Sequence, residues 1–519
     1  MRGNLRLVVI LQLLFAVLFT LAMLYPNLFS KWGLIDDHEI IINLGADNEM
    51  SLAEFPSKLL QTEVGFAKEG RSRYRPAYWT AHLLETVAWG GQPLRWYTFR
   101  LFMIAISIFI AWYLLSKYLG HIFSGITCLF LFTQSYWADI WTRLGPAELY
   151  AMFGLAVYSL AFYKIWTGKR NVWWVLLALG AFLAYGSKEN FLFLLPVTAG
   201  LVFKGWKNKT LSAVPITCAL FIFLSGFAIT GIIVYLLSKT GADIYGNSVN
   251  PMNRFFYRLL EYQNVNAFVP LFVSAILYTA SKRAPENQCP GFSPSSSLKY
   301  KNLLLIQLLL FAVWTTQFFF YYGELPLNTR YDFPGIFIYN LSMFFLLYVP
   351  FKIIGTNRVL RGIVLTGFAA YIFHIYALKG FIFIQGTSVD NLKKTSQFTQ
   401  NAVRVITALK ENPAVPVIFD SHTYSDAEPM VSFSRYLFTY GVSNPAAIFF
   451  DERAKTHRSD NLSRILTKQL LRISQNGDDS TAEDRLRFHS YSSIPQGNCF
   501  VVSFSGDSTL DCFNLGKVW

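Results

Sequence analysis

Long apolar runs separated by short polar segments dominate the first 384 residues of the chain. A helix of ~20 apolar residues is long enough to cross a lipid bilayer. The pattern therefore predicts a mainly α-helical, polytopic membrane protein. We expect about eleven transmembrane helices, near residues 5–25, 98–116, 121–139, 147–165, 171–187, 190–203, 211–238, 263–281, 302–322, 334–351 and 361–384.

The first apolar run follows Arg2 and Arg6, an arrangement also found in signal peptides. The run is long, however, and residues 24–27 (LYPN) offer no small-residue cleavage pattern. We therefore expect an uncleaved first span. The loop that follows, at about 27–97, is the longest within the membrane part, and residues 50–64 and 76–89 have the pattern of helices that lie on a membrane surface.

The pattern changes after residue 386, where apolar residues become sparser and shorter runs appear. We expect helices around 392–409, 427–440 and 460–475, buried strands at 416–419 and 447–450, and a hairpin at 499–513. The sequence thus predicts two domains. Residues 1–386 form the membrane domain, and residues 387–519 form a soluble α/β domain outside the cytoplasm.

Two of the five cysteines, Cys499 and Cys512, fall in this outer domain, where a disulfide persists more readily than in the cytoplasm. A turn at residues 505–506 would place them directly opposite each other, and a turn at 506–507 would leave them diagonal and harder to bridge. The sequence leaves the disulfide open.

Composition supports the membrane assignment. The chain has 519 residues, of which 53% are hydrophobic and only 15% charged, too few to cover a soluble protein of this size. The net charge of +14 lies wholly before residue 385, since the remainder carries 14 basic and 14 acidic residues. Because Lys and Arg mark cytoplasmic loops, this distribution indicates membrane topology and argues against a nucleic-acid partner.

The basic residues also predict orientation. With the N-terminus inside, every inner loop carries basic residues, and this alternation holds along the membrane part, which places the C-terminal domain outside. Of the 17 acidic residues before residue 385, only Glu286 falls on the cytoplasmic side. Insertion does not require this acidic bias, so it indicates that the chemistry lies on the outer face. The inner-loop cations are Lys117, Lys164, Lys169, Arg170, Lys204, Lys207, Lys209, Lys282, Arg283, Lys299, Lys301, Lys352, Arg358 and Arg361.

Four ionisable residues, Asp36, Asp37, His38 and Glu39, follow the first span. A carboxylate here can serve as general base toward an acceptor hydroxyl. Carboxylate oxygens also suit Mg or Mn, so Asp36, Asp37 and Glu39 are candidate ligands of a divalent cation. The structural alternative is a hydrated helix end that keeps the first span from slipping inward.

Three arginines, Arg71, Arg73 and Arg75, occupy alternate positions of the same outer loop. On an extended segment they share one side, and the guanidinium group suits two-point contact with phosphate. They are candidates for holding the phosphate of a lipid-linked substrate. The alternative is binding to anionic lipid head groups.

Further polar groups recur at the outer ends of later spans. Arg143 and Glu148 flank a Pro at a helix start, where they could simply pair with each other. Lys188 and Glu189 stand between two short spans with almost no loop, which favours a polar pocket. Arg330 and Tyr331 lie in a short outer loop.

Taken in order, these motifs resemble those of the GT-C glycosyltransferases: the first-loop acids, RYRP at 73–76, RLGPAE at 143–148, SKE at 187–189 and RYDFP at 330–334. The likeness covers roughly residues 1–384. Size and composition are similar to bacterial enzymes that decorate lipopolysaccharide O-antigen, including phage-type serotype-converting glucosyltransferases.

The resemblance implies a hexosyltransferase of the bacterial inner membrane that uses a polyprenyl-phosphate-linked sugar donor and a glycan or glycolipid acceptor. It implies that Asp36 or Asp37 is the base that acts on the acceptor. It also implies that the lipid phosphate is held by Arg71, Arg73, Arg75, Lys188 and Arg330. Alternatives are a glycan ligase or polymerase, or a non-enzymatic lipid or polysaccharide transporter. The absence of a sequence repeat and the charges at the outer ends of spans favour the enzyme.

Overall fold

The computed structural model describes the chain in two compact units. The helical unit comprises Met1–Leu24, Ala67–Tyr78 and Arg100–Thr387, and the sheet unit comprises Tyr25–Phe66, Trp79–Phe99 and Ser388–Trp519. The predicted domain boundary at residue 386 stays a prediction. The residues described are 2–44, 48–65, 73–168, 171–209, 211–240, 266–283, 294–320, 327–353, 358–421, 427–444, 446–450, 486–490, 498–504 and 510–517.

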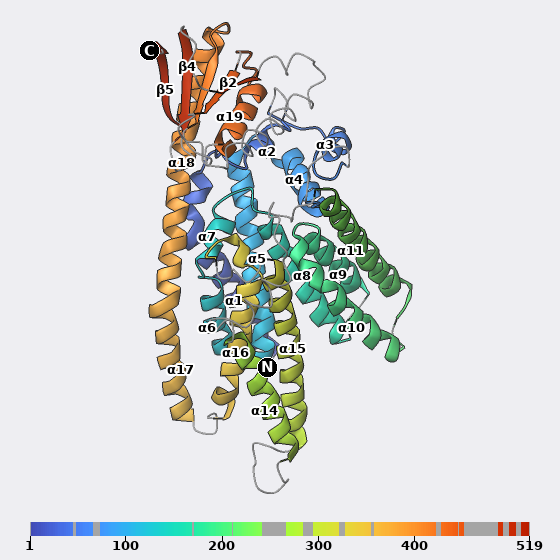
Figure 1. Cartoon of the computed structure of the whole chain (residues 1–519). Coiled ribbons are helices and arrows are strands. Elements are labelled where there is room, and N and C mark those ends of the chain that lie inside the picture. Colours follow the sequence, from blue (N-terminus) through green and yellow to red (C-terminus); the bar gives the residue numbers. More distant parts are fainter. Residues whose placement is uncertain are drawn as a thin grey trace. The chain divides into compact units, whose positions relative to one another are not determined.

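Helices lie within all of the predicted spans (Figure 1). Six described segments are long and apolar enough to cross a membrane, and four shorter apolar helices accompany them. This confirms the predicted mainly helical fold with many apolar helices. The helices are α1 (Arg2–Leu24), α5 (Pro93–Leu119), α6 (His121–Leu131), α7 (Tyr136–Trp141), α8 (Glu148–Trp166), α9 (Val172–Tyr185), α10 (Leu194–Lys207), α11 (Ala213–Thr240), α14 (Val269–Arg283), α15 (Pro294–Phe320), α16 (Gly335–Ile353), α17 (Arg358–Ile372) and α18 (Leu378–Glu411).

The prediction of one continuous helix over 121–139 was wrong, because α6 ends at Leu131 and α7 begins at Tyr136. Polar side chains lie at the break. The Thr133 hydroxyl donates to the Leu129 carbonyl at 2.6 Å, and the Gln134 amide donates to the Phe130 carbonyl at 2.7 Å. These bonds satisfy carbonyls that the next helical turn would otherwise use.

Helices α8 and α9 cross at two glycines that let their backbones touch. A Cβ added at Gly154 would lie 2.6 Å from the Ala184 nitrogen, and one at Gly180 would lie 2.6 Å from the Tyr158 nitrogen. Close approach through small residues is a common way to pack apolar helices, for which hydrophobic burial in lipid gives little driving force. The crossing fixes the register of the segments that begin α8 and follow α9.

An aromatic cluster ties three further segments of the helical unit together. The Trp137 ring lies 4.7 Å from that of Trp141 and 4.9 Å from that of Phe333, and the Phe191 ring lies 5.5 Å from Phe333. All four side chains are buried. Aromatic rings at these separations stabilise one another beyond their burial. Helix α7, the 3₁₀ turn η2 (Glu189–Phe193) and the 3₁₀ turn η4 (Arg330–Asp332) are therefore neighbours.

The sheet unit contains a five-stranded sheet in the order β3-β2-β1-β4-β5. The first four strands are parallel, and β5 is antiparallel to β4. This arrangement confirms the α/β character expected of the C-terminal region, including its hairpin, whereas the helix expected at 460–475 lies outside the described residues. The strands are β1 (Val417–Ser421), β2 (Ala446–Phe450), β3 (Leu486–Ser490), β4 (Asn498–Phe504) and β5 (Leu510–Lys517).

The register of the hairpin settles the question of the disulfide. Cys512 stands opposite Ser503, whereas Cys499 stands opposite Gly516. The two cysteines are therefore offset along the strands, and Cys499 is a buried free thiol. A disulfide does not join β4 to β5.

The first outer loop contributes short helices to the sheet unit. Residues 50–64 were expected to be helical, but only α3 (Phe55–Gln61) forms, after a turn in which the Glu54 carboxylate accepts the N–H of Ser51 at 2.8 Å. Helix α4 (Pro76–Trp89) matches its prediction, and the four-residue helix α2 (His38–Ile41) follows the acidic residues.

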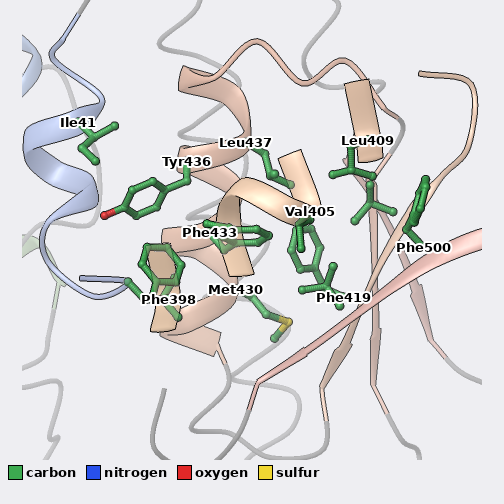
Figure 2. Packing of buried hydrophobic residues seen from close by; sticks show 14 residues of the cluster. Ile41, Phe398, Val405, Leu409, Phe419, Met430, Phe433, Tyr436, Leu437 and Phe500 are labelled. Carbon is green, nitrogen blue, oxygen red and sulfur yellow. The ribbon is translucent and has the colours of Figure 1, made fainter. Parts of the chain in front are cut away.

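The core of the sheet unit joins the first outer loop to the C-terminal region (Figure 2). Leu34 and Ile41 of the loop pack in one buried cluster with side chains of α18, of α19 (Ala427–Thr439) and of the strands. The cluster is completed by Phe398, Ala402, Val405, Leu409, Val417, Phe419, Met430, Phe433, Tyr436, Leu437, Phe500 and Val502.

Candidate functional site

The three candidate acids lie on one tight turn of the sheet unit. Asp36 has a φ of 70°, in the left-handed region that few non-glycine residues adopt. Asp37 is buried, and its Oδ2 accepts the backbone N–H of Gly33 at 2.6 Å. Asp36 and Glu39 are half-buried. The two aspartates therefore differ in surroundings, since the Asp37 carboxylate closes the turn and Asp36 occupies its strained position.

His38 is buried between them and stays neutral. Burial and, to a smaller extent, the positive charge of Arg435 on α19 together lower the pKa to about 3, although the charge of Asp36 and a backbone hydrogen bond at Leu34 act in the opposite direction. The imidazole therefore carries no charge at neutral pH. Arg435 supplies positive charge close to this turn.

The prediction that these acids bind a divalent cation comes from the sequence alone. Among the residues that the structure describes, no group of three or more His, Cys, Asp or Glu side chains is arranged to hold a metal ion. One carboxylate oxygen of Asp37 already accepts the hydrogen bond from the Gly33 N–H. The arrangement does not fit a three-carboxylate cage.

The helical unit holds a buried ion pair between two of the predicted site residues. The Lys188 Nζ lies 2.7 Å from the Glu148 Oε1, and both side chains are almost fully buried. Glu148 begins α8, where the helix dipole favours a negative charge. The suggested pairing of Arg143 with Glu148 is therefore wrong: Arg143 lies 3.0 Å from Asp139, one turn earlier in the chain.

Cations from three separate segments gather around Tyr331. The Lys188 Nζ lies 5.1 Å from the centre of its ring, and the Arg330 guanidinium lies 5.4 Å away. Burial raises the pKa of Tyr331, but the charge and hydrogen bond of Arg330 and the charges of Lys188 and Arg73 outweigh it and lower the pKa below its usual value. The described residues thus place concentrated positive potential at this phenol.

Two aspartates that the sequence analysis did not select hold the loop that carries Arg330 and Tyr331. The Asp332 carboxylate accepts the N–H groups of Leu327 and Asn328 at 2.6 and 2.8 Å. The Asp139 Oδ2 accepts the N–H of Arg330 at 3.2 Å. Asp332 directly follows the predicted site residues Arg330 and Tyr331, so its position could have indicated its role. Asp139 lies 191 residues from Arg330, and no sequence pattern indicated that they are in contact.

The arginine segment of the first outer loop joins the same region of the helical unit. The carbonyl of Gly186 accepts the N–H groups of Ala77 and Tyr78 at 2.9 and 3.3 Å. The Tyr78 hydroxyl donates to the Gly145 carbonyl at 3.0 Å, and Arg75 lies over the Tyr78 ring at 4.8 Å. The predicted motifs around residues 75, 145 and 187 are thereby brought together.

Gly186→Ala is expected to disturb this junction. An added Cβ would lie 2.5 Å from the Phe182 carbonyl oxygen and 2.7 Å from the Ala77 Cβ, so backbone must shift. Displacement of Arg75 and Lys188 should lower any activity that depends on these cations about tenfold or more, since small misplacements of positioning groups are costly. Gly200→Ala, which meets open space, is the matched control, and equal activity of the two variants would contradict the expectation.

The structure thus groups Arg73, Glu148, Lys188, Arg330 and Tyr331 in the helical unit, with Arg75 tied to the same segments. Arg143 reaches the group through Asp139. Glu189 is buried in η2 next to Lys188. The acids Asp36, Asp37 and Glu39 belong to the sheet unit. Arg71 lies outside the described residues.

Comparison with known proteins gives a structural likeness and no sequence match. No protein-family profile and no curated protein matches the chain. The structure is similar to the crystal structure of ArnT from Cupriavidus metallidurans bound to undecaprenyl phosphate. The TM-score is 0.47 and the identity 11%, and the match covers 95% of this chain and 93% of that chain.

Proposed function

We propose that the protein is an integral membrane glycosyltransferase. It moves a hexose from a polyprenyl-phosphate donor to a hydroxyl group of a glycan acceptor, such as lipopolysaccharide O-antigen, on the outer face of the bacterial inner membrane. The observation that carries the proposal is the gathering of Arg73, Lys188 and Arg330 around Tyr331 in a unit made of apolar helices. Ionised groups among apolar helices are costly and mark functional sites.

The cations suit the phosphate of the donor. As the bond between the anomeric carbon and the phosphate oxygen breaks, negative charge develops on the leaving phosphate. Preorganised cations stabilise this charge, and a low-dielectric setting strengthens the effect. Glu148 holds Lys188, and Asp139 and Asp332 hold the Arg330 loop, so the positive groups are fixed before the donor binds.

The acceptor hydroxyl attacks the anomeric carbon and transfers its proton to a carboxylate. We assign this base to Asp36 and a structural task to Asp37. Asp37 is buried and bonded to Gly33, whereas Asp36 is half-buried and held in an unusual backbone conformation. Strained residues of this kind cluster at active sites.

The assignment is tested with purified protein and a panel of radiolabelled undecaprenyl-phosphate hexoses. Label should pass to an isolated O-antigen glycolipid in the wild type and fail to pass in the Asp36→Asn variant. Glycan mass and linkage analysis of cells with and without the protein identifies the added sugar. Unchanged glycans together with no label transfer from any donor would contradict the proposal.

Arg73→Ala and Arg75→Ala are expected to lower turnover at saturating donor, because contacts that strengthen as the phosphate leaves act on kcat. Arg→Lys should restore activity only in part, since Lys lacks the two-point fork. Assays in neutral detergent remove any contribution from anionic lipids. Arg95→Ala, which removes an exposed arginine in the first turn of α5, is the control. Normal turnover in both test variants would support lipid head-group binding instead.

A further inference from the structure

Helix α19 of the C-terminal region packs directly against the turn that carries the acids. Figure 2 shows Tyr436 of α19 beside Ile41 of α2, with its hydroxyl directed toward the first-loop segment. The Tyr436 hydroxyl donates a hydrogen bond to the carbonyl of Gly33. A residue more than 400 positions away in the sequence thus contacts the residue three before Asp36.

Gly33 is held on both of its backbone groups. Its carbonyl accepts the bond from Tyr436, and its N–H donates to the Asp37 carboxylate at 2.6 Å. The turn between these bonds contains Asp36 at a φ of 70°. This conformation costs most non-glycine residues about 1 kcal/mol, and Asp adopts it more readily than most, in turns whose hydrogen bonds stabilise it.

The tyrosine is itself fixed in place. Its ring is buried and lies 5.1 Å from the Phe398 ring in an edge-on arrangement. Leu34 and Ile41, on either side of the acids, pack into the same cluster. Burial and the nearby charge of Asp37 raise the pKa of Tyr436 well above its usual value, so the hydroxyl keeps the proton that it donates.

We propose that Tyr436 is a positioning residue through which the C-terminal domain sets the geometry of Asp36. The domain would then take part in the reaction instead of serving only as a cap. This inference rests on the proposed function in so far as Asp36 is the base. The structural part of the inference is that the Tyr436 hydroxyl holds the turn at residues 33–41, and this part does not depend on the proposed function.

Tyr436→Phe removes the hydroxyl and keeps the ring in the cluster. We expect kcat to fall about tenfold, while KM for donor and acceptor stays within about twofold, because a misplaced base slows chemistry without removing binding contacts. Amide exchange of the peptide spanning residues 33–41 should become faster. The control is Tyr25→Phe, which removes the hydroxyl of an exposed tyrosine of the same unit and should change neither quantity.

Two results would overturn the inference. One is unchanged exchange at residues 33–41. The other is an unchanged kcat with only a lower melting temperature, which is what a purely structural hydroxyl predicts. If the wild type transfers no sugar at all, the proposed function fails, and the exchange measurement alone still decides whether Tyr436 holds the turn.

Discussion

Asp36→Asn is expected to reduce kcat about 100- to 10,000-fold, the range that a general base contributes. Asn has the same shape as Asp, and it tolerates the left-handed backbone that Asp36 adopts at a φ of 70°. The variant should therefore insert and fold normally and bind both substrates. Steady-state transfer rates, together with the melting temperature in detergent, measure the two effects separately.

The neighbouring aspartate supplies the matched comparison. Asp37→Asn retains an amide oxygen that can still accept the Gly33 N–H, so its loss of activity should be much smaller than that of Asp36→Asn. If only Asp37→Asn lost transfer activity, Asp37 would be the base and Asp36 would have the structural role. Near-normal activity in both single variants and in the double variant would refute carboxylate base catalysis at this turn.

The sequence predicted those features that depend on local pattern. Apolar run length predicted the spans, and α4 was predicted to the residue. Short apolar runs and turn residues predicted the strands of the C-terminal region other than β3. The break between α6 and α7 was missed, because the polar residues 133–135 are too short an interruption of the apolar run to end a helix on a hydropathy pattern.

Partnerships across the fold could not be predicted. Glu148 and Lys188 were both selected as site residues, but their pairing depends on the register set where Gly154 and Gly180 cross. Asp139 and Tyr436 were not selected, since each acts through a backbone group distant in sequence. Chemistry-bearing residues can therefore be found from residue type and order, whereas the residues that hold them require the tertiary structure.

Removing Lys188 tests whether its ion pair with Glu148 serves stability or chemistry. Lys188→Met leaves the buried carboxylate without its partner, and breaking a buried pair in this way costs about 3–5 kcal/mol. The single variant should therefore unfold at a clearly lower temperature and lose activity. That result alone would not separate the two roles, since a destabilised protein is also less active.

The double variant Lys188→Met/Glu148→Leu separates them. Replacing a buried ion pair by apolar side chains of similar volume is often neutral or stabilising, so the melting temperature should return to near the wild-type value. Turnover should stay about 100-fold or more below the wild type, because the cation that stabilises the leaving phosphate is still missing. Glu148→Gln keeps Lys188 but gives it a weaker, neutral partner. The activity of this variant should lie between that of the double variant and that of the wild type. Wild-type turnover in the stable double variant would show that the ion pair only holds α8 to the segment after α9. Stabilisation of the leaving phosphate would then be assigned to Arg73 and Arg330.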